Sequence, residues 1–140
     1  MDAKDRLSSA AYDSIESMML AYAQEAVRVA WSAHRQRLDL SPSSIGLLEK
    51  ILDGQAAVDL EFQTRLWGGY FGEVLRANFG GDWEMTEYPG SALSVTTLVV
   101  RGSRLYPLMK VYRRLTLGES ENLPSFYRMI AERLAKAPAN

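Results

Sequence analysis

Few residues of this chain belong to the types that carry catalysis. The 140 residues include no cysteine and one histidine, His34. Cysteine nucleophiles, thiolate metal sites and disulfides are therefore absent, and His34 lacks a second histidine with which to hold a metal ion. We interpret His34 as a surface residue at the end of a helix. Acidic residues do not recur at any motif spacing, so an enzyme is the less favoured class and no cofactor or metal is expected.

A glycine-rich run, Gly68 to Gly72, has a superficial likeness to a phosphate loop. It lies inside a helical pattern and lacks the Lys-Ser/Thr pair that follows the glycines of such loops. Each glycine costs about 1 kcal/mol in a helix relative to alanine. We therefore expect another backbone to approach Gly68 and Gly72 closely, because close approach is the usual reason for glycines inside a helix.

Glu73 is the one charged residue in the apolar centre of the same helix. The simpler interpretation is a local pair with Arg76, one turn further along. The alternative is a buried carboxylate that accepts hydrogen bonds from a later helical segment and ties it to the central helix. That segment carries three candidate partners, Lys110, Arg113 and Arg114. Together with Glu73, they are the candidate binding residues.

The same three basic residues follow a hairpin that carries Arg101 and Arg104, which gives the only local excess of positive charge. Contact with RNA would need such a patch beside exposed aromatic side chains. Lys and Arg number 16 against 17 for Asp and Glu, a net charge of -1. This balance gives no long-range attraction for nucleic acid or an anionic membrane. With acidic residues close by, we favour a solvated, salt-bridged face.

The longest apolar stripe predicts a helix from about Ser9 to about Arg37. A second apolar line that ends at Trp31 widens the stripe, so the helix should contact more than one neighbour. Packing in the core is the favoured interpretation. Dimerisation through this first helix is the alternative, because a long regular stripe is also typical of self-associating helices. Trp31 is therefore a further candidate binding residue.

The rest of the chain predicts an α+β fold with a helix-rich N-terminal half. Two helices are expected from Ser41-Pro42 to Gly54 and from Ala57 to Asn78. Three strands, residues 83–88, 93–100 and 104–106, are separated by turn residues and form an antiparallel meander covered by helices. Pro107 opens a helix that Gly118 ends, and the last helix begins near Ser120 or Asn122. Residues 1–140 form one domain, with residues 1–9 and 137–140 frayed.

The middle strand, Leu93 to Val100, is rich in β-branched residues and should be central. Period-two alternation places its residues on two faces. One face is expected to carry Leu93, Val95, Thr97 and Val99, and the other Leu98 and Val100.

Several motifs of the second half belong together. They are Leu66-Trp67-Gly68-Gly69-Tyr70-Phe71-Gly72-Glu73-Val74-Leu75, a Gly-Gly turn with Trp83, Tyr106-Pro107 with Lys110-Val111-Tyr112-Arg113-Arg114-Leu115, and Asn122-Leu123 with Phe126-Tyr127. This pattern resembles a family of uncharacterised small bacterial domains over about the last half of the chain. The resemblance implies no particular activity, cofactor or catalytic residue.

The sequence favours a non-catalytic protein-interaction domain of the accessory or immunity type, which binds its partner through the sheet face or through Trp31. Neither a nucleic acid nor a membrane is an expected partner. The N-terminal residues are polar and acidic and no stretch approaches the roughly 18 apolar residues of a membrane span, which predicts a cytoplasmic protein. The alternative is a small-molecule-binding protein or enzyme with a pocket between the central helix and the sheet, lined by Glu73.

Overall fold

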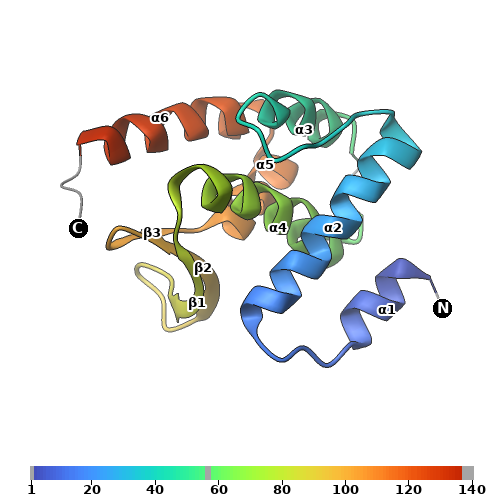
Figure 1. Cartoon of the computed structure of the whole chain (residues 1–140), viewed down its shortest axis with the longest axis horizontal. Helices are drawn as coiled ribbons and strands as arrows, with labels where there is room; N and C mark the ends of the chain where they lie inside the picture. The colour runs from blue at the N-terminus through green and yellow to red at the C-terminus, as the bar shows by residue number, and fades with distance from the viewer. Residues whose placement is uncertain (1, 56–57, 137–140) are drawn as a thin grey trace.

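In the computed structural model, residues 2–55 and 58–136 are described and form an α+β fold of six α-helices and a three-stranded antiparallel sheet (Figure 1). The helices are α1 (Ala3–Ser9), α2 (Ile15–His34), α3 (Ser44–Asp53), α4 (Leu60–Phe79), α5 (Pro107–Leu117) and α6 (Leu123–Lys136), with a 3-10 helix η1 (Glu119–Glu121). The strands are β1 (Asp82–Glu87), β2 (Ser94–Val100) and β3 (Ser103–Leu105). Helices dominate the N-terminal half, as predicted.

Helix α4 is the centre of the fold. Its residues from Leu66 to Leu75 are all buried, and it packs between α2 and α5. The glycines explain how the neighbours come so close. A Cβ on Gly68 would lie 2.7 Å from the Cα of Leu108 in α5, so the predicted approach of another backbone is confirmed there. At Gly72 strand β1 and helix α5 also lie against the helix, but through side chains, because the space is filled by the Trp83 indole and by Pro107.

The helix predicted from about Ser9 to about Arg37 is α2, which is shorter at both ends. It begins only after Ser14, whose backbone is extended and whose side chain accepts a hydrogen bond from the N–H of Ser17 at 3.0 Å. Helix α2 ends when Arg35 adopts φ 55°, in the left-handed region. Ahead of Ser14, the separate helix α1 (Ala3–Ser9) begins with the Asp2 carboxylate accepting a hydrogen bond from the N–H of Asp5 at 2.8 Å. The expectation of a frayed segment at residues 1–9 is therefore wrong for Ala3–Ser9, and residues 137–140 lie outside the described residues.

Helices α3 and α4 begin later than predicted. The hydroxyl of Ser41 accepts a hydrogen bond from the N–H of Ser44 at 3.2 Å, but the helix itself starts at Ser44. The predicted first residue of the next helix, Ala57, lies outside the described residues, and α4 starts at Leu60 after Asp59, whose φ is 48°. One face of α3 is buried in the same apolar core as α4.

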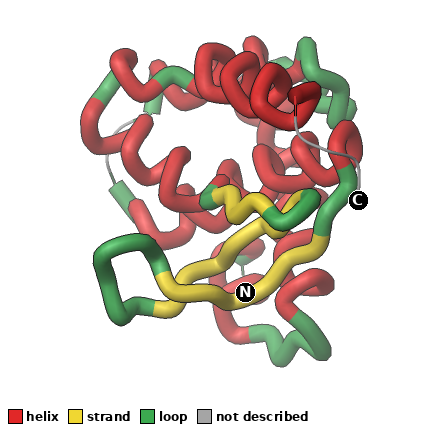
Figure 2. The backbone as a smooth tube through the Cα atoms, turned by 90° about the vertical axis from the view of Figure 1, so that its left-hand side faces the viewer, coloured by secondary structure: helices red, strands yellow, loops and turns green. Residues whose placement is uncertain are grey.

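The sheet has the predicted order, with β2 between β1 and β3 and both pairings antiparallel, so the meander is confirmed. Figure 2 shows the three strands side by side. Strand β2 begins at Ser94, one residue later than predicted, and Leu93 is 70% exposed, whereas Leu98 and Val100, on the other predicted face, are fully buried. Leu98 pairs with Trp83 and with Leu105, two other buried side chains, and these three together cover the core.

Candidate functional site

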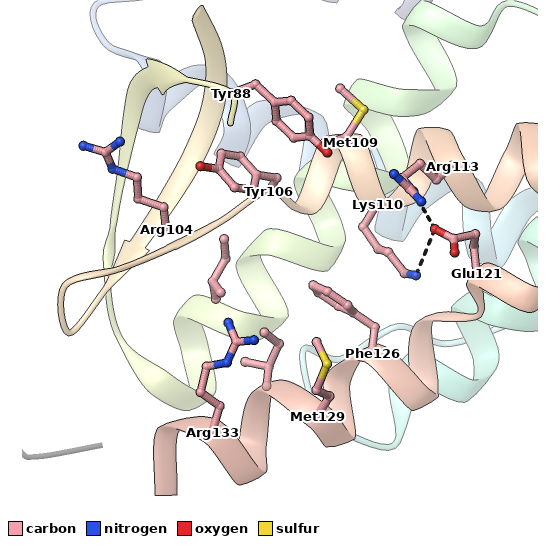
Figure 3. Close-up of a pocket in the computed structure, with 12 residues that line it drawn as sticks. Tyr88, Arg104, Tyr106, Met109, Lys110, Arg113, Glu121, Phe126, Met129 and Arg133 are labelled. Carbon is pink, nitrogen blue, oxygen red and sulfur yellow. Dashed lines mark hydrogen bonds and ion pairs between the residues drawn. The ribbon is translucent and has the colours of Figure 1, made fainter. Parts of the chain in front are cut away.

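A cavity of about 340 Å³ opens among the segment after β1, strand β3 and helices α5, η1 and α6 (Figure 3). We call it the arginine–tyrosine pocket. Its lining residues are Tyr88, Arg104, Leu105, Tyr106, Met109, Lys110, Arg113, Glu121, Phe126, Met129, Ile130 and Arg133. Two of the predicted binding residues, Lys110 and Arg113, therefore lie at one site.

Helix α5 positions one wall of this pocket. Pro107 occupies its first position, where the missing N–H costs nothing and φ is already helical, and it follows directly on the short strand β3. Because residues three and four apart share a helix face, Tyr106, Lys110 and Arg113 line the same side of α5. Gly118, at φ 92°, ends the helix and turns the chain into η1.

Helix α6 positions the opposite wall. Asn122 begins it by accepting the N–H of Ser125 at its side-chain oxygen, at 2.9 Å. Phe126, Met129 and Arg133 follow at spacings of three and four and line the pocket together. Arg133 is not among the binding residues predicted from the sequence. Its spacing from Phe126 and Met129 was the signal that could have found it.

Glu121 holds the two basic residues of α5. Its Oε1 lies 2.6 Å from Arg113 Nε and 3.5 Å from Lys110 Nζ, and Figure 3 shows both cations converging on it. The hydrogen bond from Arg113 lowers the pKa of the Glu121 carboxyl, and the same bond raises the pKa of Arg113. Lys110 Nζ also lies 5.1 Å from the centre of the Phe126 ring, within cation–π range. The expected salt-bridged face is present here.

The pocket nevertheless keeps an excess of positive charge. Four cationic side chains and one carboxylate line it, a balance of +3, on a chain whose net charge is -1. Arg104 and Arg133 form no ion pair with any described residue. In Figure 3 Arg133 points into the space between α6 and β3, whereas the guanidinium of Arg104 points away from Lys110 and Arg113. Arg133 is thus a cation that faces the pocket without a carboxylate partner among the residues the structure describes.

Aromatic and thioether side chains supply the apolar part of the pocket. The rings of Tyr88 and Tyr106 meet edge to face, with centroids 5.0 Å apart and an angle of 71° between the planes. Met109, Phe126 and Met129 complete this surface. The arrangement offers positive charge beside polarisable apolar surface, which suits an anionic group attached to an apolar or aromatic one.

Glu73 is buried, as the alternative interpretation required, but the basic partners which that alternative predicted on α5 are wrong. Its Oε2 accepts hydrogen bonds from Trp83 Nε1 at 2.8 Å and from Arg76 Nε at 3.1 Å. Lys110 and Arg113 pair with Glu121 instead. The local pair with Arg76 is therefore the correct interpretation, and the bond from Trp83, on the first strand, is an addition that helix spacing does not reveal.

Arg114 has a different role from its neighbours. Its side chain is 5% exposed and donates from Nε to Glu49 at 2.7 Å and from Nη2 to Asp53 at 2.8 Å, both on α3. Burial works to lower the pKa of Arg114, but the bonds to the two carboxylates outweigh it and raise that pKa. The other oxygen of Glu49 accepts the N–H of Leu123 at 3.0 Å. Arg114 thus joins α3, α5 and the start of α6, which positions both walls of the arginine–tyrosine pocket.

Trp31 lies apart from this site, on α2. It is 42% exposed, and the guanidinium carbons of Arg37 and Arg35 lie 4.3 and 5.2 Å from the centre of its ring. Two other exposed apolar residues, Leu20 and Val27, lie on the same helix. His34, in the last turn of α2, has its Nε2 3.4 Å from the side-chain nitrogen of Gln55 and its ring edge-on to Trp67, the helix-end position that we expected.

A second cavity, of about 480 Å³, lies between α4, the sheet and α5. We call it the apolar pocket. Its lining residues are Leu60, Glu61, Thr64, Arg65, Met85, Ser94, Val95, Thr96, Leu108, Met109 and Tyr112. Glu73 is not one of them, so the carboxylate expected in a pocket between the central helix and the sheet is not there.

No helix among residues 2–55 and 58–136 is long and apolar enough to cross a membrane. Within the same described ranges, no group of three or more histidine, aspartate and glutamate side chains is placed to hold a metal ion. Comparisons with protein-family models, with curated proteins and with solved structures found no significant match to this chain. The resemblance of its second half to small bacterial domains therefore stays a prediction.

Proposed function

We propose that this protein is a non-catalytic interaction domain that binds an acidic segment of another protein in the arginine–tyrosine pocket. The observation that carries the proposal is the excess of positive charge lining that pocket, on a chain of net charge -1: Lys110, Arg113 and Arg133 against Glu121 give +2, and Arg104 at the rim raises it to +3. Positive charge collected in one concave place on an otherwise acidic molecule attracts an anion locally and orients it on approach.

The residue types are suited to bind carboxylates. Arginine presents a planar set of donors that matches a carboxylate. Arg113, Arg133 and Lys110 line this pocket, in addition to Arg104 at its rim. Tyr88 and Tyr106 add rigid surface that can pack on the stem of an acidic side chain and donate hydrogen bonds from their hydroxyls. Both features are typical of surfaces that bind peptides.

The openness of the site favours a segment over a small molecule. Arg113, Met129 and Arg133 are exposed at the same time as they line the pocket. Sites for small molecules bury most of their ligand in a concave cavity. Here Arg113 and Arg133 lie at an open rim, where they can contact successive residues of an extended chain, while Lys110 lies deeper, with its side chain 14% exposed.

The carboxylate of Glu121 pairs with two of the cations that would bind a carboxylate of the ligand. By pairing with Lys110 and Arg113 it holds both cations toward the pocket. A carboxylate that arrives between Arg133 and Lys110 competes with Glu121 for Lys110. Replacing Glu121 with glutamine removes this competitor, and binding of an acidic peptide should then become tighter.

The test is a fluorescence anisotropy titration with the labelled peptide Glu-Asp-Glu-Gly-Ser-Ser-Gly. We expect Lys110→Ser with Arg133→Ser to weaken binding at least about tenfold, because each charge-assisted contact contributes roughly 1.5–3 kcal/mol. Arg128→Ser is the matched control, since Arg128 is an exposed arginine of α6 that does not line the pocket. Equal weakening by the control, or no binding to the unaltered protein, would reject the proposal.

A small-molecule site in the apolar pocket is the second candidate function. The cavity of about 480 Å³ supports it. The charged residues that line it, Glu61 and Arg65, pair with each other at 2.9 Å and leave no net charge to select a ligand. This candidate is therefore the weaker of the two.

A further inference from the structure

The two pockets adjoin each other across α5. Met109 lines both of them, with Lys110 and Arg113 on the side of the arginine–tyrosine pocket and Leu108 and Tyr112 on the side of the apolar pocket. The two cavities therefore lie on either side of a ridge that α5 forms. A helix with its side chains is about 10–12 Å across, and an extended peptide rises about 3.3 Å per residue. A segment that crosses the ridge needs about three residues to pass from one pocket to the other.

The apolar pocket has the chemistry of a site for an uncharged side chain. Leu60, Met85, Leu108, Met109 and Tyr112 line it. Met85 is 55% exposed and Tyr112 43% exposed, so large apolar surface remains in contact with water. Methionine is flexible and polarisable, and it adapts to apolar partners of different shape. Burying a bulky apolar side chain here would remove that surface from water.

Polar groups at the same pocket are available to a peptide backbone. The hydroxyl of Thr64 is buried without a hydrogen-bond partner among the described residues, and Thr64 lines the pocket. Strand β3 ends at Leu105, opposite Leu98, so Ser94–Thr96 of β2 have a strand partner in β1 and none in β3. Backbone groups at such an incomplete edge are typical sites for pairing with an added chain.

From these observations we infer that the apolar pocket accepts a bulky apolar side chain of the same acidic segment, about three residues from its carboxylates. The inference rests on the proposed function, because it takes the arginine–tyrosine pocket as the site for the acidic residues. The partner is then a peptide segment with an acidic cluster and a leucine or similar residue at that spacing. The arginine–tyrosine pocket, with its positive charge, and the apolar pocket, with no net charge, together set the direction of the segment along the surface.

The experiment uses three labelled peptides in the same anisotropy assay. The first is Glu-Asp-Glu-Gly-Ser-Leu-Gly, the second has serine in place of leucine, and the third keeps leucine but has Gln-Asn-Gln in place of the acids. We expect the first to bind roughly tenfold or more tighter than the second, since burying a leucine contributes about 1.5–3 kcal/mol. The third should bind at least about tenfold more weakly than the first.

The matched variants locate the gain. Met85→Ser with Tyr112→Ser should reduce binding of the first peptide to that of the second, and both positions are exposed enough for the fold to tolerate the change. Leu117→Ser, at a 62% exposed position on the same helix, is the control and should leave all three affinities unchanged within about twofold.

The outcomes separate this inference from the proposed function. If the first two peptides bind equally and both depend on Arg133, the acidic site stands and the role of the apolar pocket is rejected. If the Met85 and Tyr112 substitutions weaken binding of the second peptide as much as binding of the first, the apolar pocket does not recognise the leucine and the inference fails. If the second peptide does not bind, or the third binds as well as the first, the proposed function fails and the inference fails with it.

Discussion

Arg114 is the residue whose removal should most weaken the arrangement of helices around the candidate site. Replacing it with methionine keeps most of the apolar stem and removes the guanidinium that donates to Glu49 and Asp53. Arg113→Met is the matched control, because Arg113 is its neighbour in sequence but is 48% exposed and pairs with Glu121 at the surface.

The expected loss follows from burial. Breaking a buried ion pair typically costs about 3–5 kcal/mol, because the remaining charge is left without a partner. The Asp53 side chain is 71% exposed and returns to water, whereas that of Glu49 is 17% exposed and keeps the N–H of Leu123. Both facts favour the lower end, so we expect a loss of about 3 kcal/mol for Arg114→Met and less than about 1 kcal/mol for Arg113→Met.

Urea unfolding followed by circular dichroism measures both free energies of unfolding under one condition. Adding Glu49→Gln to Arg114→Met should recover part of the loss, because the unpaired carboxylate is then gone. A loss for Arg114→Met as small as that for Arg113→Met would refute the reasoning, since it would mean that Arg114 joins no helices in solution.

Three further predictions concern the other charged and exposed residues. Glu73→Ala should lose about 1–3 kcal/mol of unfolding free energy, because the indole N–H of Trp83 is left unpaired. Glu73→Gln should lose less, because the glutamine amide oxygen still accepts that N–H. Equal losses of the two variants in urea unfolding would contradict this bond. The ion pairs of Glu121 with Lys110 and Arg113 lower the pKa of the Glu121 carboxyl. These pairs therefore stabilise the fold above the ordinary glutamate pKa of about 4.3, and this stabilisation is lost as the pH falls through the lowered pKa. The stability difference between the unaltered protein and Glu121→Gln, under about 1 kcal/mol, should therefore vanish in acid, and a constant difference would contradict the pairing. Self-association through α2 predicts a dimer in sedimentation that Trp31→Glu disrupts; a monomer at tens of micromolar, roughly the range of weak association, would remove the idea.

The parts of the fold that the sequence predicted well depend on local chemistry. Short turns force neighbouring antiparallel strands, so the order of the sheet follows from the residues between the strands. Pro107 and Gly118 likewise mark both ends of α5 within the chain itself. The start of α2 was predicted too early because the apolar stripe already includes Tyr12, and only the local hydrogen bond of the Ser14 side chain shows where the helix begins.

The candidate site was harder to predict because its residues come together through tertiary packing. Lys110 and Arg113 were selected, and Glu121 was near them in sequence. Arg114 reaches Glu49 over 65 residues of sequence, so nothing local distinguishes this buried arginine from its exposed neighbour. The second partner of Glu73, Trp83, was not predicted for the same reason, because the turn after α4 that brings Trp83 back onto that helix is not visible in helix periodicity.

The most direct test of the binding site is a ¹H–¹⁵N NMR titration of the whole protein with the peptide Glu-Asp-Glu-Gly-Ser-Ser-Gly. A second group of exposed basic residues on and after α2, which includes Arg28, Arg35 and Arg37, provides an internal comparison on the same molecule. If the arginine–tyrosine pocket binds acidic segments, saturable shift changes should concentrate in Tyr106–Arg113, η1 and the α6 residues that line it. Changes of equal size around Arg35 and Arg37, or changes that grow linearly with peptide concentration, would show general charge attraction and contradict a site in this pocket.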